Sequence, residues 1–541
     1  DLFPASQEAE ILDLSAFDAP AGTPLAEALD LDDVLLEIDN KSMTNRPDLW
    51  GHYGIARELA ALYNLPLKKI EPYQPEVQSD FKVEIDDPDR CTRYIGVEMS
   101  GVSVKPSPYK MQSRIWKVGM RPINALVDVT NYVMLATGQP SHAYDSDHIA
   151  GHIIVRRAEE NETLKLLNGK DLPLNTDDLV IADDEGAVGL AGVMGGANSE
   201  IKDGTQTVVF ESANFMGSSV RITSRALGMR TESSGRFEKG LDSEMTLAAL
   251  DRACELVELL GAGEVVDGLI DVRREEKPTA TVALECERIN RFLGMDIPEQ
   301  RMREILESLL FRIEGNTIYV PSWRDDVRCM NDIAEEVIRI WGYNDIRSTA
   351  FLAGVKTGEY TPRKAYSNRL ARLLCALGCW ETCTFSFISP KYYDKVGMAE
   401  DDPRRRSVVI RNPLGEDTSV MRTVLLPSVL EALARNNNNH ADDTALFETA
   451  PVYIQTADPT LQPAEPLHTA VAFYGGDFYV LKGMLEEILE DAGIKGCRIC
   501  SCADAPTYHP GRCARMLTAD GTQLAILGEL HPTVAAAYGF D

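Results

Sequence analysis

Three polar side chains that can exchange or hold protons, Thr130, Asn131 and His142, lie in the stretch INALVDVTNYVMLATGQPSHAYD, residues 123–145. Short groups that donate, accept or exchange protons are what a hydrolytic pocket needs to hold a water molecule against an ester. The turn signal Gly-Gln-Pro shortly precedes His142. A buried segment with satisfied polar groups would have the same composition, so this stretch alone leaves both interpretations open.

A second set of candidates is acidic and lies in SWRDDVRCMNDIAEE. Asp332, Glu335 and Glu336 have the spacing i, i+3, i+4 and therefore share a face of the predicted helix, and Asp326 precedes that helix. Carboxylates that converge repel one another unless a cation compensates them, and oxygen-only ligands suit Mg²⁺. The spacing therefore predicts a magnesium site, with a solvated acidic helix start as the alternative.

The 11 cysteines are scattered and form no even disulfide framework, which is typical of a reducing cytoplasm. Cys497 and Cys500 form a C-x-x-C pair, but no second pair has zinc spacing, so we assign no zinc site. Cys375, Cys379 and Cys383 have helical spacing and predict one buried stripe.

A length of 541 residues predicts three to five domains, and 44% hydrophobic with 26% charged residues is typical of a globular protein. No apolar run is long enough to cross a membrane, so we expect a cytoplasmic protein without membrane contact. The net charge of -30 restricts any nucleic-acid contact to a local patch, a partner or a further module. Because the first residue is Asp1, we expect that an N-terminal portion is absent.

Hydrophobic periodicity divides the chain into four parts and predicts a multidomain α+β protein. Residues 1–78 hold a strand-like piece, DDVLLEID, a helix and a linker. Residues 79–275 alternate strand patterns such as TVVFESANF with helices, as in an α/β module. Residues 276–349 combine helices with a hairpin at EGNT, which indicates a small winged-helix-like module. Residues 350–541 predict a largely antiparallel sheet with helices.

The motifs together resemble one family. DVTNYVMLATGQPSHAYD, AGVMGGANSE, VVFESANF and TESSGRFEKGLD follow in this order, between TNRPDLWGHYGIARELAAL and PSWRDDVRCMNDIAEEVIRIWGY. This set closely resembles the beta subunit of bacterial phenylalanine–tRNA ligase over essentially the whole chain. Relative to the family, an N-terminal tRNA-binding module and a C-terminal anticodon-binding module are absent, and the loop in AFYGGDFYVLKG is shorter.

The resemblance implies an editing site that hydrolyses tyrosine wrongly attached to tRNA(Phe). Glu211 corresponds to the residue that recognises the tyrosine hydroxyl. The resemblance also implies pocket-lining roles near the ester, the aminoacyl group and the amino-acid side chain for Thr130, Asn131, His142, Gly192, Gly195, Thr231 and Ser233. The family more usually has Asp and Ala where this chain has Glu232 and Ser233, which leaves the amino-acid selectivity open.

The resemblance further implies an assembly of two alpha and two beta subunits that charges tRNA(Phe). It places Mg²⁺ at Asp326, Asp332, Glu335 and Glu336, at the contact with the alpha subunit. Residues 350–541 resemble a degenerate class II synthetase fold without ATP-binding motifs, on which Arg422 and Arg435 are candidate surface contacts.

Two alternatives belong to other functional classes. One is a non-catalytic tRNA-binding scaffold with an inactive editing pocket. The other is a free-standing trans-editing hydrolase, which would have no use for the domain that resembles a class II synthetase.

Overall fold

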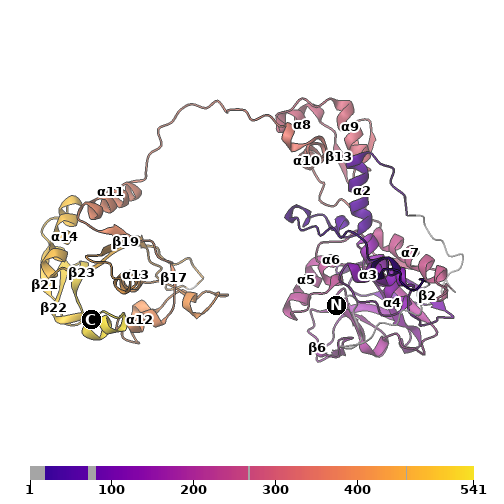
Figure 1. Cartoon of the computed structure of the whole chain (residues 1–541), viewed down its shortest axis with the longest axis horizontal. Helices are drawn as coiled ribbons and strands as arrows, with labels where there is room; N and C mark the ends of the chain where they lie inside the picture. The colour runs from indigo at the N-terminus through magenta and orange to yellow at the C-terminus, as the bar shows by residue number, and fades with distance from the viewer. Residues whose placement is uncertain (1–18, 71–80, 266–267, 459, 541) are drawn as a thin grey trace. The chain divides into compact units, whose positions relative to one another are not determined.

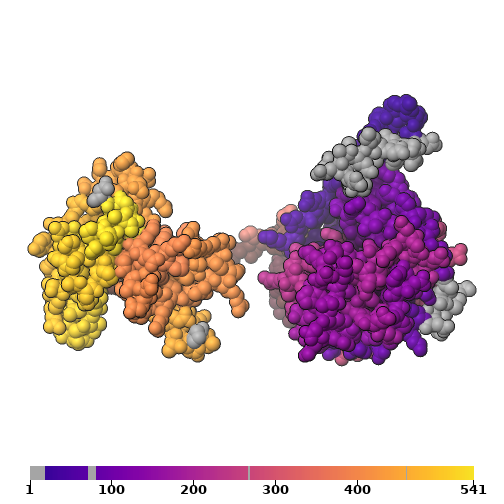
Figure 2. Space-filling view, turned by 90° about the horizontal axis from the view of Figure 1, so that it is seen from below, coloured from indigo at the N-terminus to yellow at the C-terminus, as the bar shows by residue number. Residues whose placement is uncertain are grey.

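A computed structural model describes residues 19–70, 81–265, 268–458 and 460–540 of the chain. It divides into two compact units, residues 1–350 and 351–541. Figure 1 labels their helices and strands, and Figure 2 shows one face of each unit in a space-filling view. Within the described ranges, no helix is both long and apolar enough to cross a bilayer.

The first unit begins with two helices, α1 (Leu25–Ala28) and α2 (His52–Tyr63). The predicted helix after Pro47 is therefore present. The strand-like piece DDVLLEID is not a strand, because residues 31–40 have no ladder partner and Val34, Leu35 and Leu36 are exposed. Alternating apolar residues produce a strand only where a neighbouring strand satisfies the backbone.

Two five-stranded sheets form the centre of the first unit. The first has the order β1-β4-β7-β8-β9 and consists of Val83–Ile85, Ile153–Arg157, Leu179–Ala182, Ala187–Leu190 and Met194–Gly195. The second has the order β11-β2-β10-β3, with β12 also on β2, and consists of Glu264–Val265, Cys91–Ser100, Val208–Phe215, Ser141–Asp145 and Ile270–Arg273. A short hairpin, β5 (Thr163–Lys165) and β6 (Asp171–Pro173), lies outside both sheets.

Strand β10 is the structural centre of this region because it is paired on both sides and buried along its whole length. Its alternate residues Val209 and Ala213 belong to a core shared with the first sheet, whereas Val208 and Phe210 belong to a core shared with helices. The helices of that second core include α3 (Tyr109–Lys117), α4 (Ala125–Thr137) and α7 (Met245–Leu259). A strand covered on both faces must be apolar throughout, so a charged residue in it calls for an explanation.

The first unit also contains a small module with three strands and three helices. The strands β13 (Thr281–Ala283), β15 (Thr317–Tyr319) and β14 (Arg312–Glu314) are antiparallel, and the last two form the predicted hairpin around Gly315. The helices are α8 (Cys286–Leu293), α9 (Glu299–Ser308) and α10 (Met330–Trp341).

The second unit has three small sheets, mostly antiparallel as predicted. Their orders are β16-β19-β20, β17-β18 and β21-β22-β23, and among the described residues of this unit only β16 and β19 pair in parallel. The strands are Trp380–Glu381, Ala445–Pro451, Leu467–Phe473, Phe387–Ile388, Val420–Met421, Arg498–Ser501, Tyr508–Leu517 and Gln523–Leu530. The helices α11 to α15 are Pro362–Ala376, Lys391–Lys395, Leu426–Asn438, Phe478–Asp491 and Pro532–Ala537.

Two predictions for the second unit are wrong. Helix α11 ends at Ala376, so Cys379 and Cys383 do not continue a helical stripe, and of the three cysteines only Cys379 is buried. Arg422 is not a surface contact, since it is 1% exposed and donates to Glu448 at 2.9 Å. Arg435 is exposed on α13, as predicted.

Candidate active site

Glu211 lies in the middle of β10, directly opposite Gly96 of β2 and His142 of β3. Residues directly opposite one another in an antiparallel ladder project to the same face. Glu211 and His142 are therefore neighbours on the face that packs against the first sheet. Gly96 contributes no side chain there, which leaves room beside the carboxylate.

Two tyrosine hydroxyls bind the Glu211 carboxylate. Tyr94 donates to Oε2 at 3.0 Å and Tyr144 donates to the same oxygen at 2.5 Å. Glu211 is 6% exposed, and none of its ion-pair or hydrogen-bond partners in the described chain is a lysine or arginine. Burial raises the pKa of Glu211 to about 7, against the opposing effect of the two phenols. The group is thus partly ionised near neutral pH.

His142 is half-buried beside this carboxylate. Its ring lies edge-on to Tyr144, with 4.5 Å between the ring centroids. Burial lowers the pKa of His142 to about 4, so the imidazole is neutral at physiological pH. A neutral imidazole has one nitrogen that donates and one that accepts, which allows it to orient a water molecule.

Gly195 of β9 lies against the His142 ring. A Cβ on Gly195 would be 2.6 Å from Cε1 and Nε2 of His142, closer than such atoms approach. This position therefore needs glycine because the imidazole occupies the space of a side chain. Gly192 has φ +70° and packs against Phe237 and Val220, so the preceding turn also needs glycine.

Thr231 and Ser233 bind the backbone of that glycine turn. The Thr231 hydroxyl donates to the Val193 carbonyl at 2.9 Å, and the Ser233 hydroxyl donates to the Gly192 carbonyl at 3.1 Å. Thr231 also caps the short helix α6 (Glu232–Phe237), accepting from the Ser234 amide. In this structure both hydroxyls fix the turn that carries Gly195 towards His142.

Thr130 and Asn131 lie on α4. The Thr130 hydroxyl donates to the Val127 carbonyl of its own helix at 2.8 Å, and Asn131 is half-buried. The apolar residues Val129 and Val133 of the same helix pack in the core on the sheet face opposite Glu211. Contacts of Thr130 and Asn131 with a substrate ester remain a prediction.

Tyr94 and Tyr144 are site residues that the sequence patterns did not identify. Tyr94 lies on β2 two residues from Gly96, and Tyr144 lies on β3 two residues from His142, so each is on the same sheet face as that residue. Alternation around His142 would have identified Tyr144. The sequence gives no signal that either hydroxyl reaches Glu211, because the separations along the chain are 117 and 67 residues.

Two of the four acidic residues predicted to bind Mg²⁺, Asp326 and Glu336, share one arginine partner. Arg324 donates to Glu336 at 2.6 Å and 2.7 Å and to Asp326 at 2.8 Å and 2.9 Å. Asp332 accepts the backbone amides of Arg328 and Cys329 at the start of α10, whereas Glu335 is exposed. No group of three metal-binding side chains occurs in the described ranges, and magnesium binding at these four acids remains a prediction.

The arginine-bound acids belong to a longer ion-pair network within the first unit. Arg339 donates to Glu336 and to Glu58 of α2, and Glu58 also accepts from Arg46 at 2.7 Å. Burial opposes ionisation of Glu336, but Arg324 and Arg339 lower its pKa to about 2. The network joins α2 to the small module by paired charges.

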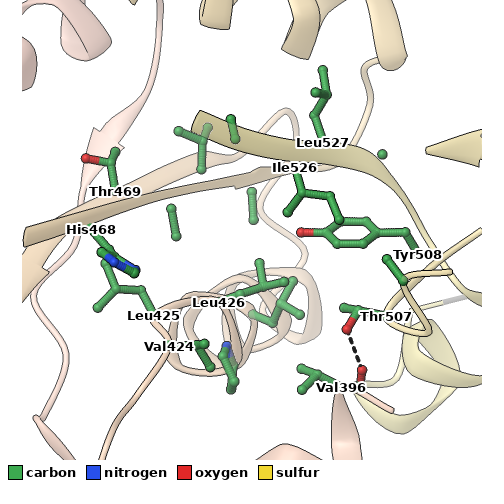
Figure 3. A pocket seen from close by; sticks show the side chains of 18 of the residues that line it. Val396, Val424, Leu425, Leu426, His468, Thr469, Thr507, Tyr508, Ile526 and Leu527 are labelled. Carbon is green, nitrogen blue, oxygen red and sulfur yellow. Dashed lines mark hydrogen bonds between the residues drawn. The ribbon is translucent and has the colours of Figure 1, made fainter. Parts of the chain in front are cut away.

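The second unit contains a cavity of about 1980 Å³. Apolar side chains including Val424, Leu426, Ile526 and Leu527 line it, with the polar groups of His468 and Tyr508 at its wall (Figure 3). Thr507 donates to the Val396 carbonyl at 2.7 Å beside it. The cavity contains none of the residues predicted for hydrolysis.

Three family models match successive parts of the chain. Residues 90–262 match the B3/4 domain, and residues 282–343 match the tRNA synthetase B5 domain. Residues 346–541 match the phenylalanyl-tRNA synthetase beta chain CLM domain. Glu211 and His142 thus lie in the B3/4 match, and the Arg324 network lies partly in the B5 match.

Curated relatives match nearly the whole chain. The phenylalanine–tRNA ligase beta subunit of Clostridium tetani is 38% identical over 535 residues, covering 97% of this chain and 67% of the relative. That of Carboxydothermus hydrogenoformans is 39% identical, with coverage of 97% and 67%, and that of Geobacter metallireducens is 39% identical, with coverage of 99% and 69%. The chain thus spans about two thirds of the length of these relatives. A solved structure of an N-terminal fragment of the phenylalanyl-tRNA synthetase beta subunit from Pyrococcus horikoshii matches 58% of this chain and 90% of the fragment, at 17% sequence identity. The TM-score of 0.32 is too low to establish a shared overall fold.

Proposed function

Because this chain belongs to the beta-subunit family of phenylalanine–tRNA ligase, we propose that it acts with an alpha subunit in charging tRNA(Phe) and removes tyrosine wrongly attached to that tRNA. The charging role is supported by the names of its relatives and by the match of residues 346–541 to a domain of the beta chain. The assembly is proposed to contain two alpha and two beta chains in the cytoplasm.

Editing answers a physical limit of the charging site. An apolar pocket built for phenylalanine rejects an amino acid that only adds a hydroxyl by about a hundredfold. A second site can prefer tyrosine over phenylalanine if it holds a buried polar group that pairs with the tyrosine hydroxyl. Phenylalanine would leave that group unpaired. The hydroxyl of tyrosine is the only chemical difference between the two substrates.

The observation that carries the proposal is the Glu211 carboxylate. It is buried on the face that also holds His142, and it is bound by neutral phenols instead of by a cation. A carboxylate of this kind retains its capacity to accept a charge-assisted hydrogen bond. Such a bond from tyrosine would compensate the cost of burying Glu211, and phenylalanine offers no replacement.

His142 has the properties of a residue that orients water. A histidine with a pKa of about 4 is a weak base at neutral pH, so it contributes little by proton abstraction. Holding water against the ester carbon can itself supply much of the rate. In this proposal Gly195 fixes the imidazole, while the ester-lining roles of Thr130 and Asn131 rest on the family resemblance alone, since α4 packs on the sheet face opposite Glu211.

The test is deacylation of tRNA(Phe) charged with tyrosine or with phenylalanine by the assembled ligase. Glu211→Gln keeps the shape of the side chain and removes its charge. We expect it to slow tyrosine-ester hydrolysis by about tenfold to a hundredfold, since a hydrogen bond to a charged group contributes about 1.5–3 kcal/mol. Phenylalanine-ester hydrolysis should stay as slow as before.

Glu98→Gln is the matched control because Glu98 lies on β2, on the same sheet face, and binds Ser146 at 2.9 Å. It should leave both rates unchanged. An unchanged ratio of tyrosine to phenylalanine hydrolysis in Glu211→Gln would remove Glu211 as the recognising group. A wild-type assembly that hydrolyses neither ester would instead indicate a binding scaffold.

A further inference from the structure

We propose that Tyr94 and Tyr144 are positioning residues that saturate one oxygen of Glu211 and leave the other, Oε1, to accept the hydroxyl of the substrate. This inference rests on the proposed editing function. It assigns a specificity role to two side chains that do not need to touch the substrate.

The first support is the pattern of hydrogen bonds on the carboxylate. Both phenols donate to Oε2, and a carboxylate oxygen has two lone pairs, so these bonds use its capacity. Among the residues that the structure describes, none donates a hydrogen bond to Oε1. This oxygen is also not one of the fully buried atoms that lack a partner, so the remaining exposure of Glu211 includes it.

The second support is the placement of the two tyrosines on the sheet. Tyr94 of β2 is opposite Ala213 of β10, and Tyr144 of β3 is opposite Val209 of β10. The two tyrosines therefore flank Glu211 diagonally, from the two sides of β10. Both rings are almost completely buried in the core between the sheets. Their hydroxyls can therefore turn little, and the carboxylate between them is held in one orientation.

Glycine backbone covers the site from the facing sheet. A Cβ on Gly189 of β8 would lie 3.6 Å from the Tyr144 hydroxyl and 3.8 Å from Cα of Gly195. Gly189 and Gly195 are direct partners in the β8–β9 ladder. This glycine pair lets the facing strands approach both Tyr144 and His142, which further restricts the Tyr144 hydroxyl.

The arrangement also sets the charge of Glu211. Its ionisable neighbours are Tyr94 and Cys91 from β2 and Tyr144 and His142 from β3. Burial raises the pKa of Glu211, and both phenolic hydrogen bonds oppose that rise. Removing one phenol should therefore raise the pKa further and shift tyrosine selectivity to higher pH.

Tyr144→Phe and Tyr94→Phe test this inference because each removes one hydroxyl and keeps the ring. The assembled ligase is assayed for deacylation of tRNA charged with tyrosine or phenylalanine between about pH 6 and pH 9, a range that brackets the Glu211 titration. We expect kcat/KM for the tyrosine ester to fall about threefold to tenfold at neutral pH. Its pH midpoint should rise, with the phenylalanine ester unaffected.

Tyr132→Phe is the control, since the Tyr132 hydroxyl accepts from Arg114 on the helix side of the sheet. It should leave the rates and the pH midpoint unchanged. If either site variant accelerates tyrosine hydrolysis, its hydroxyl competes with the substrate, and the inference is wrong. An unchanged pH midpoint in both site variants would equally overturn it.

Glu211→Gln separates this inference from the proposed function. Loss of selectivity in Glu211→Gln together with wild-type behaviour in both tyrosine variants would leave the editing proposal standing and remove only the positioning role. If Glu211→Gln itself keeps full selectivity, the editing proposal fails first.

Discussion

Glu211 and Glu336 are both almost completely buried glutamates, at 6% and 3% exposure, yet their surroundings are opposite. Glu336 is bound by the guanidinium groups of Arg324 and Arg339, which bring its pKa to about 2 in spite of burial. Glu211 is bound by two neutral phenols, and burial brings its pKa to about 7.

The difference separates a structural carboxylate from one suited to recognition. A carboxylate paired with cations has its charge compensated inside the protein, so a ligand gains little by approaching it. A carboxylate held by phenols remains only partly compensated, and a further donor stabilises its charge. Perturbed buried groups of the second kind are the usual candidates for functional sites.

The largest expected effect is on stability, at the Arg324 network. Arg324→Met leaves Glu336 and Asp326 without their main cation, which should lower the free energy of unfolding by about 3–5 kcal/mol, as measured by chemical denaturation. The control is Arg303→Met, which removes a partly exposed pair with Glu299 and should cost no more than about 1 kcal/mol. Equal losses in the two variants would contradict the structural role of Arg324.

The next largest expected effect is on catalysis, at Gly195, which lies against the His142 ring beside Glu211. Gly195→Ala places a methyl group in the space of the His142 ring and forces the ring to move. Hydrolysis of both esters should fall by about ten- to a hundredfold with their ratio unchanged, because misplacing a group by about 1 Å has this cost. Gly204→Ala, where nothing lies within 4 Å of the new methyl, should be silent. Full activity in Gly195→Ala would show that His142 does not position the reaction.

A smaller effect is the pH dependence of stability, for which the two carboxylates have opposite signs. Glu211 has a raised pKa, so its contribution is present below about pH 4.5 and is lost as pH rises through about 7. Glu336 has a lowered pKa, so its contribution is present above about pH 4.5 and is lost as pH falls through about 2. The free energy of unfolding of the wild type should therefore fall by about 1–3 kcal/mol between about pH 4.5 and pH 7 because of Glu211, and this fall should be absent in Glu211→Gln.

That difference is measured as the free energy of unfolding of wild type minus Glu211→Gln across the pH range. A constant difference would mean that Glu211 ionises normally in the folded protein.

The smallest expected effect concerns magnesium. Three of the four predicted ligands already have partners in the chain. We therefore expect Mg²⁺ to shift the unfolding temperature of the wild-type chain by no more than it shifts the unfolding temperature of Glu335→Gln. Glu307→Gln, which removes an exposed acid from α9, corrects for general screening of the net charge of -30. A Mg²⁺-dependent shift that Glu335→Gln alone abolishes would show that this chain binds Mg²⁺ at the acidic cluster.

Local sequence patterns correctly predict the elements that carry these two glutamates. The resemblance to the family was correct, and the strand pattern TVVFESANF correctly located the strand that carries Glu211. The helical spacing of Asp332, Glu335 and Glu336 was also correct, since all three lie on α10. Local periodicity is sufficient for such assignments because it depends only on neighbouring residues.

The partners of the charges could not be predicted in this way. Arg324 is two residues from Asp326, but its pairing with Glu336 requires the chain to fold back on α10. Arg422 is predicted as a surface contact, but it is compensated by Glu448, which is 26 residues away in sequence and which no local pattern connects to it. Such pairs are set by tertiary packing, and they decide whether a charged residue is structural or available.

The most direct measurement is a carbon-13 NMR titration of the glutamate carboxyl groups, in which the signal absent from Glu211→Gln is assigned to Glu211. We expect this signal to titrate with a midpoint near pH 7. Tyrosine amide should shift it, whereas phenylalanine amide should not. A midpoint at or below the usual glutamate value of about 4.3, or equal responses to the two amides, would contradict the assignment of Glu211 as the group that recognises the tyrosine hydroxyl.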